Sequence, residues 1–520
     1  MPAPAAILDL VARFGEHIDA YKSGSYNEKQ LRTDYIDPLF EALGWDMNNK
    51  QGYAEAYRDV IHEDQIKVGG AVKAPDYGFY IGGNRKFFLE AKKPSVRIKD
   101  DISPAYQLRR YAWSAKLPLS ILSDFEEFAI YDTRIKPVPS DPASKARIFY
   151  CRFDEYAQHW DHITGIFSIE AIRKGSFDKY AATAKGKRGT AEVDADFLAT
   201  IEGWRADLAH NLALRNPALT QRELNFSVQR VLDRLIFLRI CEDRGIEDYE
   251  RLKKAADAKG IYPALVKLFQ QADDRYNSGL FHFHSEKGRH EDHDTLTPHL
   301  VIDDALLKPL IRGLYYPESP YEFSVFTADI LGQVYEQFLG KVITLSPSHK
   351  ATVEDKPEVK KAGGVFYTPT YIVDYIVRQT VGTLISQIEE HEVKLGARRT
   401  EKAQERKQLS GFGAGIDVTD EKMPKRVLDR VAALRVLDPA CGSGSFLIGA
   451  YQFLLDWHLS WYVRTGTQRW ARAKNPPIVQ RANGDWVLSL TERKRILLGN
   501  IHGVDIDSQA VEVTKLSLLL

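Results

Sequence analysis

A hairpin pattern at residues 75–93 constrains the fold of this chain more than any other feature. The stretch reads PDYGFYIGGNRKFFLEAKK, and its central Gly-Gly-Asn tolerates the positive φ angles of a tight turn between two β-like runs. A three-residue loop pairs Ile81 with Arg85, and this register brings Asp76 opposite Glu90. Because cross-strand Cβ atoms lie about 4.5–5.5 Å apart, we expect two carboxylates to face each other.

The two carboxylates predict a metal site. Side chains alternate along a strand, so Phe88, Glu90 and Lys92 share one face of the hairpin. Directly opposed like charges destabilise a sheet unless a cation or a proton accompanies them. Magnesium prefers carboxylate and water oxygens, so we expect Asp76 and Glu90 to hold it, with Lys92 orienting a water beside it. This is equipment for phosphodiester hydrolysis; the alternative is a solvated hairpin whose charges face water.

Two helical segments near the hairpin favour the hydrolytic interpretation. Gln107 and Tyr111 are four residues apart and fall on one helix face, and the amphipathic stretch 27–46 carries Glu28. Together with the hairpin, these segments resemble the PD-(D/E)xK nuclease superfamily, specifically the nuclease domain at the N-terminus of restriction enzymes. The matching pieces are Pro75-Asp76, Glu90-Ala91-Lys92, the Gln-x-x-x-Tyr of 107–111 and the helix from Glu28 to Trp45.

The resemblance assigns a role to each matching residue. It implies that the two hairpin carboxylates bind the metal and that Lys92 assists the nucleophile. It implies that Glu28 adds a carboxylate, and that Gln107 and Tyr111 support the site or touch the DNA backbone. Double-stranded DNA is the implied partner, and a homodimer or transient self-association for cleavage is compatible with it.

The chain as a whole divides into three regions. Its 520 residues predict roughly two to four domains. Residues 1–170 mix helix and strand patterns, 181–194 form a polar linker, 195–345 show helical spacing, and 346–520 contain a strand–glycine–helix pattern. The expected fold is therefore multidomain α/β with an all-helical connector. The expected strands of the first region are Gly78–Ile81, Lys86–Ala91, Leu119–Ser123 and Phe128–Tyr131.

Composition and missing motifs exclude several classes of protein. With 44% hydrophobic and 27% charged residues and no long apolar run, the chain is not expected to span a membrane. Cys151, Cys241 and Cys441 are too widely spaced for a disulfide framework or a zinc site, which suits a reducing cytoplasm. No G-x-x-x-x-G-K-[ST] occurs between the first and third regions, so no ATP motor is expected there. The middle region resembles the helical connector of fused restriction-modification enzymes, which implies a spacer between two active sites.

The third region carries a pattern for binding a nucleoside. Arg435 to Ala450 read RVLDPACGSGSFLIGA, a strand, an acidic residue, a glycine turn and a helix. A second strand pattern ends in Asp505, at the position from which an acid grips ribose hydroxyls in doubly wound folds. A glycine turn alone could be structural, but both elements together suit an adenosine ligand.

These elements resemble the γ-class amino-methyltransferases of DNA, which use S-adenosylmethionine and have a Rossmann-like fold. Asp438-Pro-Ala-Cys-Gly-Ser-Gly-Ser-Phe446 is similar to their motif I, Gly503-Val-Asp505 to motif II and Phe366-Tyr-Thr-Pro369 to motif X. The resemblance implies that the motif I and motif X residues surround the methionine part of the cofactor and that Asp505 holds the ribose. The implied cofactor-binding residues are Tyr367, Thr368, Asp438, Ala440, Gly442, Gly444, Phe446 and Asp505. Cys441 lies inside motif I and is expected to be a small packed residue.

The chain departs from this family in one respect. Motif IV, an Asn/Asp-Pro-Pro followed by an aromatic that stacks on a flipped base, does not follow motif II. The Asn-Pro-Pro at 475–477 precedes motif II, lacks the aromatic and is expected in a surface loop. The apolar end at 511–520 predicts a truncated chain without a target-recognition domain.

The sequence thus predicts a truncated type IIG restriction-modification enzyme that cuts DNA with magnesium and methylates adenine. The alternatives are a non-catalytic DNA- or cofactor-binding fragment and a methyltransferase with a decayed nuclease.

Overall fold

The computed structural model divides into two compact units. It describes residues 2–51, 58–62, 67–68, 71–72, 75–81, 84–183, 193–276, 278–284, 293–326, 330–356, 368–395, 423–480 and 486–519. The first unit takes most of residues 1–360, and the second takes Leu331–Leu339 together with Lys361–Leu520. Each unit is described by itself.

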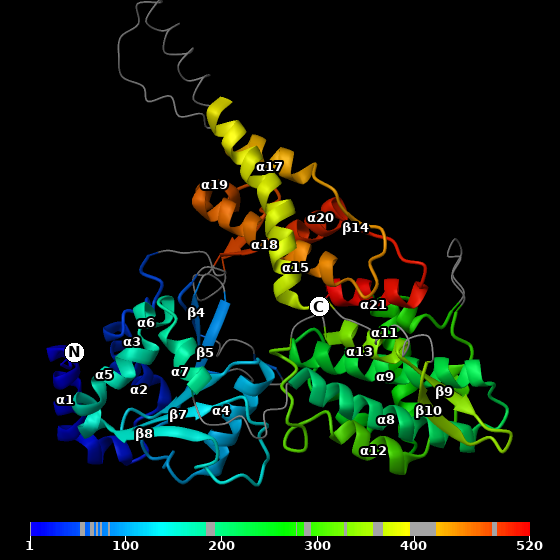
Figure 1. Ribbon diagram of the computed structural model, residues 1–520, viewed down its shortest axis with the longest axis horizontal. Helices are drawn as coiled ribbons and strands as arrows, with labels where there is room; N and C mark the ends of the chain where they lie inside the picture. The colour runs from blue at the N-terminus through cyan, green and yellow to red at the C-terminus, as the bar shows by residue number, and fades with distance from the viewer. Residues whose placement is uncertain are drawn as a thin grey trace, which may run out of the picture. The chain divides into compact units, whose positions relative to one another are not determined.

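The first unit contains a six-stranded sheet in the order β1-β4-β5-β6-β7-β8 (Figure 1). Its strands are β1 (Val60–His62), β4 (Tyr77–Ile81), β5 (Asn84–Ala91), β6 (Leu119–Ser123), β7 (Glu127–Asp132) and β8 (Arg147–Arg152). Neighbouring strands are antiparallel except β5 and β6, which are parallel. A separate short pair joins β2 (Lys67–Val68) to β3 (Ala71–Val72). The four expected strands are confirmed, whereas β1 and β8 were not predicted.

Helices cover both faces of this sheet. They are α1 (Ala5–Lys22), α2 (Glu28–Leu31), the π-helical η1 (Arg32–Ile36), α3 (Asp37–Ala42), α4 (Ile102–Ser114), α5 (Tyr156–Phe167), α6 (Ile169–Arg173) and α7 (Ser176–Thr183). Phe87 and Leu89 of β5 pack in one core with residues of α1, α3 and α5. Phe88, between them, packs in a second core with Leu108 of α4. The expected alternation of β5 is confirmed, and it makes a three-layer α/β/α arrangement.

The turn between β4 and β5 differs from the prediction. Ile81 pairs with Asn84 instead of Arg85, and Arg85 pairs with Tyr80. A register shift between Phe79 and Tyr80 absorbs one residue, as β-bulges do. Beyond the bulge the pairs follow the expected register, so the open end of the hairpin still brings the two acidic positions together.

The rest of the first unit is helical except at its end. It contains α8 (Val193–Arg215), α9 (Gln221–Asp243), α10 (Arg251–Ala255), α11 (Ile261–Tyr276) and α12 (Asp304–Arg312), with short 3₁₀ turns at Gly279–Phe281 and Thr297–His299. The expectation of an all-helical connector is wrong at β9 (Lys341–Leu345), which forms an antiparallel hairpin with β10 (Ala351–Asp355). The β-branched Val342, Ile343 and Thr344 explain β9, because such side chains favour strands.

The second unit is built around one long helix. α18 (Ser445–Arg464) follows β11 (Val436–Asp438), which pairs in parallel with β14 (Ile501–Gly503). The other elements are α13 (Ile330–Leu339), α15 (Thr370–Val377), the π-helical η6 (Arg378–Gly382), α17 (Met423–Ala432), α19 (Thr467–Ala471), β12 (Ile478–Gln480), β13 (Trp486–Leu488), α20 (Leu490–Asn500) and α21 (Ser508–Leu519). Asn475 is exposed in the loop before β12, as predicted. Among the described residues, no helix combines the length and apolarity that a membrane span requires.

Candidate functional sites

The acidic end of the β4–β5 hairpin holds the first candidate site. Asp76, directly before β4, is buried, and its Oδ2 accepts a hydrogen bond from the backbone N–H of Ala91 at 2.7 Å. Its Oδ1 accepts from Arg32 Nη1 at 3.1 Å. A second guanidinium nitrogen of Arg32 lies 3.2 Å from His62 Nδ1. Ala91 of β5 and Arg32 of the helix η1 thus fix the orientation of the Asp76 carboxylate.

Glu90 is the most buried group of the site. Its side chain is 3% exposed, and its Oε1 accepts hydrogen bonds from Lys92 Nζ at 2.5 Å and from Gln107 Nε2 at 2.8 Å. Its Oε2 is buried and has no hydrogen-bond partner among the described residues. Burial and the neighbouring Asp76 raise the pKa of Glu90 to about 8, although Lys92 opposes this shift. The site therefore carries more acidic groups than its own cations neutralise.

Lys92 and Glu28 complete the charged cluster. Burial lowers the pKa of Lys92, but Glu90 and Glu28 outweigh burial, so the net shift is upward and the ammonium is charged at neutral pH. Burial and the charge of Asp76 raise the pKa of Glu28, which begins α2 and is half-buried. The structure thus brings Glu28, Asp76, Glu90 and Lys92 close enough for their charges to influence one another.

Helix α4, which packs in the second core of the sheet, contributes two side chains to the site. Gln107 reaches Glu90 directly, and the buried Tyr111 lies close enough for the charge of Glu90 to help raise its pKa, after burial itself. Arg110, which directly precedes Tyr111, has a different partner: it forms an ion pair with Glu322 at 2.9 Å. α4 therefore links the acidic cluster to the helical part of the same unit.

The chemistry of the donors fits a magnesium ion with a small protein ligand set. Within the described ranges, no three His, Cys, Asp or Glu side chains form a ready cluster for a metal. The close pair Asp76 and Glu90 is the usual protein contribution to Mg²⁺, which keeps several waters. The unpartnered Oε2 of Glu90 is the oxygen that such a cation would satisfy.

Arg32 was not predicted as part of this site. The sequence placed it four residues after Glu28 on one helix face, and that spacing was the available signal. Its cation neutralises Asp76 and stacks 4.5 Å from the ring centroid of Tyr77. It therefore helps to position the carboxylate of Asp76, whereas Lys92 contacts Glu90.

The second candidate site lies at the carboxyl ends of β11 and β14. Asp438 ends β11 and pairs with Gly503, and Asp505 follows two residues later. The two Asp505 oxygens accept hydrogen bonds from the backbone N–H groups of Gly442 at 2.8 Å and Asp507 at 2.9 Å. The Asp505 carboxylate thus connects the glycine turn after β11 with the turn after β14, the two turns that the sequence predicts to bind one ligand.

The glycine turn has a shape that larger residues would not allow. Gly444 has φ +87°, in the left-handed region, and forms the N-cap of α18. A Cβ on Gly444 would lie 2.5 Å from Thr514 Cγ2, and Thr514 Oγ1 donates to the carbonyl of Gly442 at 2.9 Å. The turn and α21 are consequently in direct contact.

The other predicted cofactor residues are placed as follows. Thr368 lies half-buried just before α15, whereas Tyr367 lies outside the described residues. Ala440 is exposed, with its N–H donating to Asp438 Oδ1 at 3.1 Å. Phe446, in the first turn of α18, packs against the core of the second unit. Cys441 is buried and burial raises the pKa of its thiol, which confirms a packed residue.

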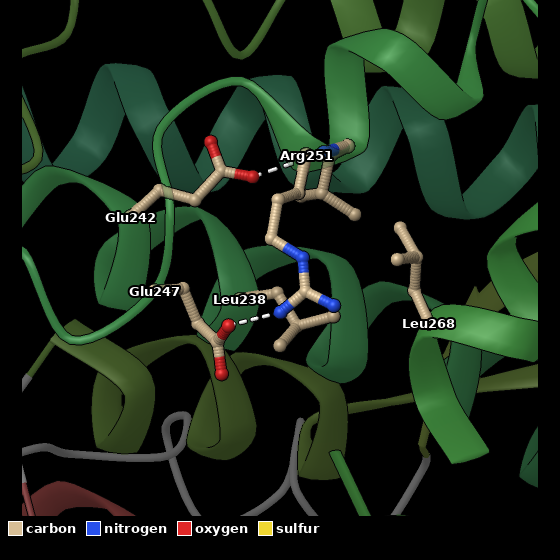
Figure 2. A pocket seen from close by; sticks show the side chains of 6 residues that line it. Leu238, Glu242, Glu247, Arg251 and Leu268 are labelled. Carbon is tan, nitrogen blue, oxygen red and sulfur yellow. Dashed lines mark hydrogen bonds and ion pairs between the residues drawn. The ribbon is translucent and has the colours of Figure 1, made fainter. Parts of the chain in front are cut away.

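A further hollow lies within the helical part of the first unit, between α9, α10 and α11 (Figure 2). Its polar lining is already paired: Glu247 with Arg251, and Glu242 with the N–H of Leu252 at 2.9 Å. No predicted site residue lines it. The two sites above are therefore the better candidates.

Comparisons with known proteins agree with this picture. Residues 416–520 match the family model of the MmeI DNA-methyltransferase domain. The type II restriction enzyme and methyltransferase RM.Eco57I of Escherichia coli is 34% identical over 513 residues, which cover 98% of this chain and 46% of that protein. The chain is related to fused restriction-modification enzymes. A protein of Methanocaldococcus jannaschii named "Putative type II restriction enzyme and methyltransferase RM.MjaORFECS2P" is 25% identical over 97% of this chain and 45% of its own length.

The relationship extends through all three regions, because the alignments run along nearly the whole chain. The chain spans about half the length of the curated relatives it matches. No solved structure matches it significantly.

Proposed function

We propose that this chain contains the DNA-cleaving centre and the cofactor-binding start of a type IIG restriction-modification enzyme. The nuclease is of the PD-(D/E)xK kind, and the second unit begins a Rossmann-like adenine methyltransferase that uses S-adenosylmethionine. Double-stranded DNA is the substrate of both activities. The observation that carries the proposal is that Asp76, Glu90, Lys92 and Gln107 lie together. Lys92 and Gln107 both donate hydrogen bonds to the buried Glu90, and the backbone N–H of the residue after Glu90 donates to Asp76.

In the nuclease centre, each residue has a definable task. Asp76 and Glu90 would hold Mg²⁺, which supplies Lewis-acid polarisation of a phosphate oxygen and of a bound water. Lys92 keeps its proton and stabilises negative charge that develops on the phosphate. Gln107 holds one oxygen of Glu90, which leaves the other oxygen free for the metal. The intact set argues against a decayed nuclease.

In the methyltransferase part, the residues would bind and orient the cofactor. Asp505, two residues after β14, would accept hydrogen bonds from ribose hydroxyls, because each of its oxygens retains a lone pair beyond its backbone contact. Gly442 and Gly444 let the backbone approach the ligand closely. S-adenosylmethionine supplies the methyl group.

The test is cleavage of plasmid DNA in the presence of Mg²⁺ by the parent protein and by Lys92→Ala. We expect the variant to lose cleavage by about a hundredfold or more, as loss of one electrostatic stabiliser commonly does. Lys86→Ala is the matched control, since Lys86 lies on β5, which Lys92 directly follows, but pairs with Asp178. If Lys92→Ala cuts as well as the parent, the nuclease assignment is wrong.

A further inference from the structure

Helix α13 contacts the glycine turn of the second unit, although it lies about a hundred residues earlier in the chain. Gly332 and Glu336 are one helical turn apart, and both face Ser443 in that turn. A Cβ on Gly332 would lie 2.9 Å from Ser443 Cβ. Only glycine at this position allows the helix to approach so closely, so the contact is specific to this helix face.

Glu336 brings a negative charge to the turn. Its Oε1 accepts a hydrogen bond from Ser443 Oγ at 2.7 Å and would lie 3.9 Å from a Cβ built on Gly442. The side chain is half-buried, and burial raises its pKa. Among the described residues it forms no ion pair with a lysine, arginine or histidine, and Ser443 is its one hydrogen-bond partner. Its second oxygen therefore has no hydrogen-bond partner among the described residues.

The other carboxylates of this site are already engaged by the backbone. Both oxygens of Asp505 accept N–H groups, and Oδ1 of Asp438 accepts the N–H of Ala440. Glu336 differs because its partner is a side-chain hydroxyl of the turn and not a backbone N–H. A carboxylate without a counter-charge, partly removed from water, is stabilised most by a cation that also donates hydrogen bonds.

We propose that Glu336 is a further cofactor-binding residue, whose carboxylate accepts the ammonium group of the amino-acid part of S-adenosylmethionine. The inference rests on the proposed use of this cofactor. Asp505 lies at the end of β14, where the ribose is expected, and Glu336 reaches the turn of Gly442 and Ser443, where the methionine part is expected. The ammonium is the group of the cofactor that combines positive charge with N–H donors. Ser443 holds the carboxylate in the direction of the turn.

The test is isothermal titration of the whole 520-residue chain with two ligands. S-adenosylhomocysteine and 5′-methylthioadenosine share the adenosine and the thioether, but only the first has the ammonium and carboxylate. We expect Glu336→Gln to weaken binding of S-adenosylhomocysteine about tenfold or more, since a charge-assisted hydrogen bond is lost, and to leave binding of 5′-methylthioadenosine unchanged. The ligand difference isolates the amino-acid part.

Glu389→Gln is the matched control, because Glu389 is also a partly buried carboxylate of the second unit and accepts a hydrogen bond from Trp457. It is expected to alter neither affinity. Glu336→Asp, which keeps the charge, serves as the second variant, and it should bind S-adenosylhomocysteine more tightly than Glu336→Gln. Unchanged thermal unfolding would show that the variants fold.

The outcomes separate this inference from the proposed function. If the parent binds neither ligand, cofactor use by this chain is refuted. If the parent binds and Glu336→Gln binds S-adenosylhomocysteine equally well, the role of Glu336 is refuted. Equal weakening of both ligands would also overturn it, because Glu336 would then support the turn without contacting the ammonium.

Discussion

Replacement of Glu322 by alanine should loosen helix α4 and thereby the nuclease centre. Glu322 and Arg110 form an ion pair whose side chains are 2% and 8% exposed, and Glu322 also accepts a hydrogen bond from Ser324. Removal of one partner of such a buried pair costs roughly 3–5 kcal/mol, because the other charge stays buried. Arg110 keeps contacts to the carbonyl oxygens of Ser319 and Tyr321, which places the expected loss near the lower end, about 3 kcal/mol.

Hydrogen exchange measured by mass spectrometry is the appropriate assay, because it reports on α4 separately from other elements. A loss of about 3 kcal/mol would accelerate exchange of α4 amides roughly a hundredfold where they open locally. Plasmid cleavage should fall in parallel, since α4 holds Gln107 against Glu90. Glu170→Ala is the control: Glu170 pairs with Lys174 in an exposed ion pair, so its loss should leave exchange in α4 unchanged. Unchanged exchange in α4 of Glu322→Ala would refute the reasoning.

Two further predictions concern the second unit. Gly444→Ala should destabilise it by about 3 kcal/mol, from left-handed backbone strain and the contact with Thr514, and Thr514→Ala should restore part of the loss in urea unfolding. Burial, assisted by Arg495, lowers the pKa of His458 from 6.5 to about 4, although Glu492 opposes this. As the pH falls, His458 is therefore protonated in the unfolded state before it is protonated in the folded state. Up to about 3 kcal/mol of stability should be lost as the pH falls from 6.5 to 4. Unfolding of His458→Gln, measured across that range, should lack this part of the pH dependence; equal slopes in both proteins would contradict the assignment.

Local patterns in the sequence predicted the acidic cluster well, and physical reasons explain this. Strand alternation and hairpin pairing are short-range, so Asp76 and Glu90 could be brought together by counting along the chain. A bulge shortened the turn, yet it preserved the pairing beyond it. The β9 strand was missed because its apolar residues continue the helical spacing of the preceding segment, and its β-branched composition was the overlooked signal.

Long-range contacts could not be predicted in this way. The hydrogen bond between Glu336 and Ser443 joins residues 107 positions apart, and nothing in their local patterns relates them. Likewise, the sequence shows only that Arg110 lies near Gln107 on one helix. Its ion pair with Glu322, about two hundred residues later, becomes visible only in the fold. Such partners depend on how separate elements pack, which is a property of the whole fold.

The position of α13 has a consequence for dividing the protein into pieces. The chain enters the second unit at Leu331–Leu339, returns to the first for the β9–β10 hairpin, and enters the second again from Lys361. A gene split between β10 and α15 would therefore leave α13 on the first fragment and its binding surface, including Ser443, on the other. Two such fragments, co-expressed, should recombine through that helix, as complementing halves of one protein do. Separation of the two units as independent proteins would instead require α13 to be transplanted with the second.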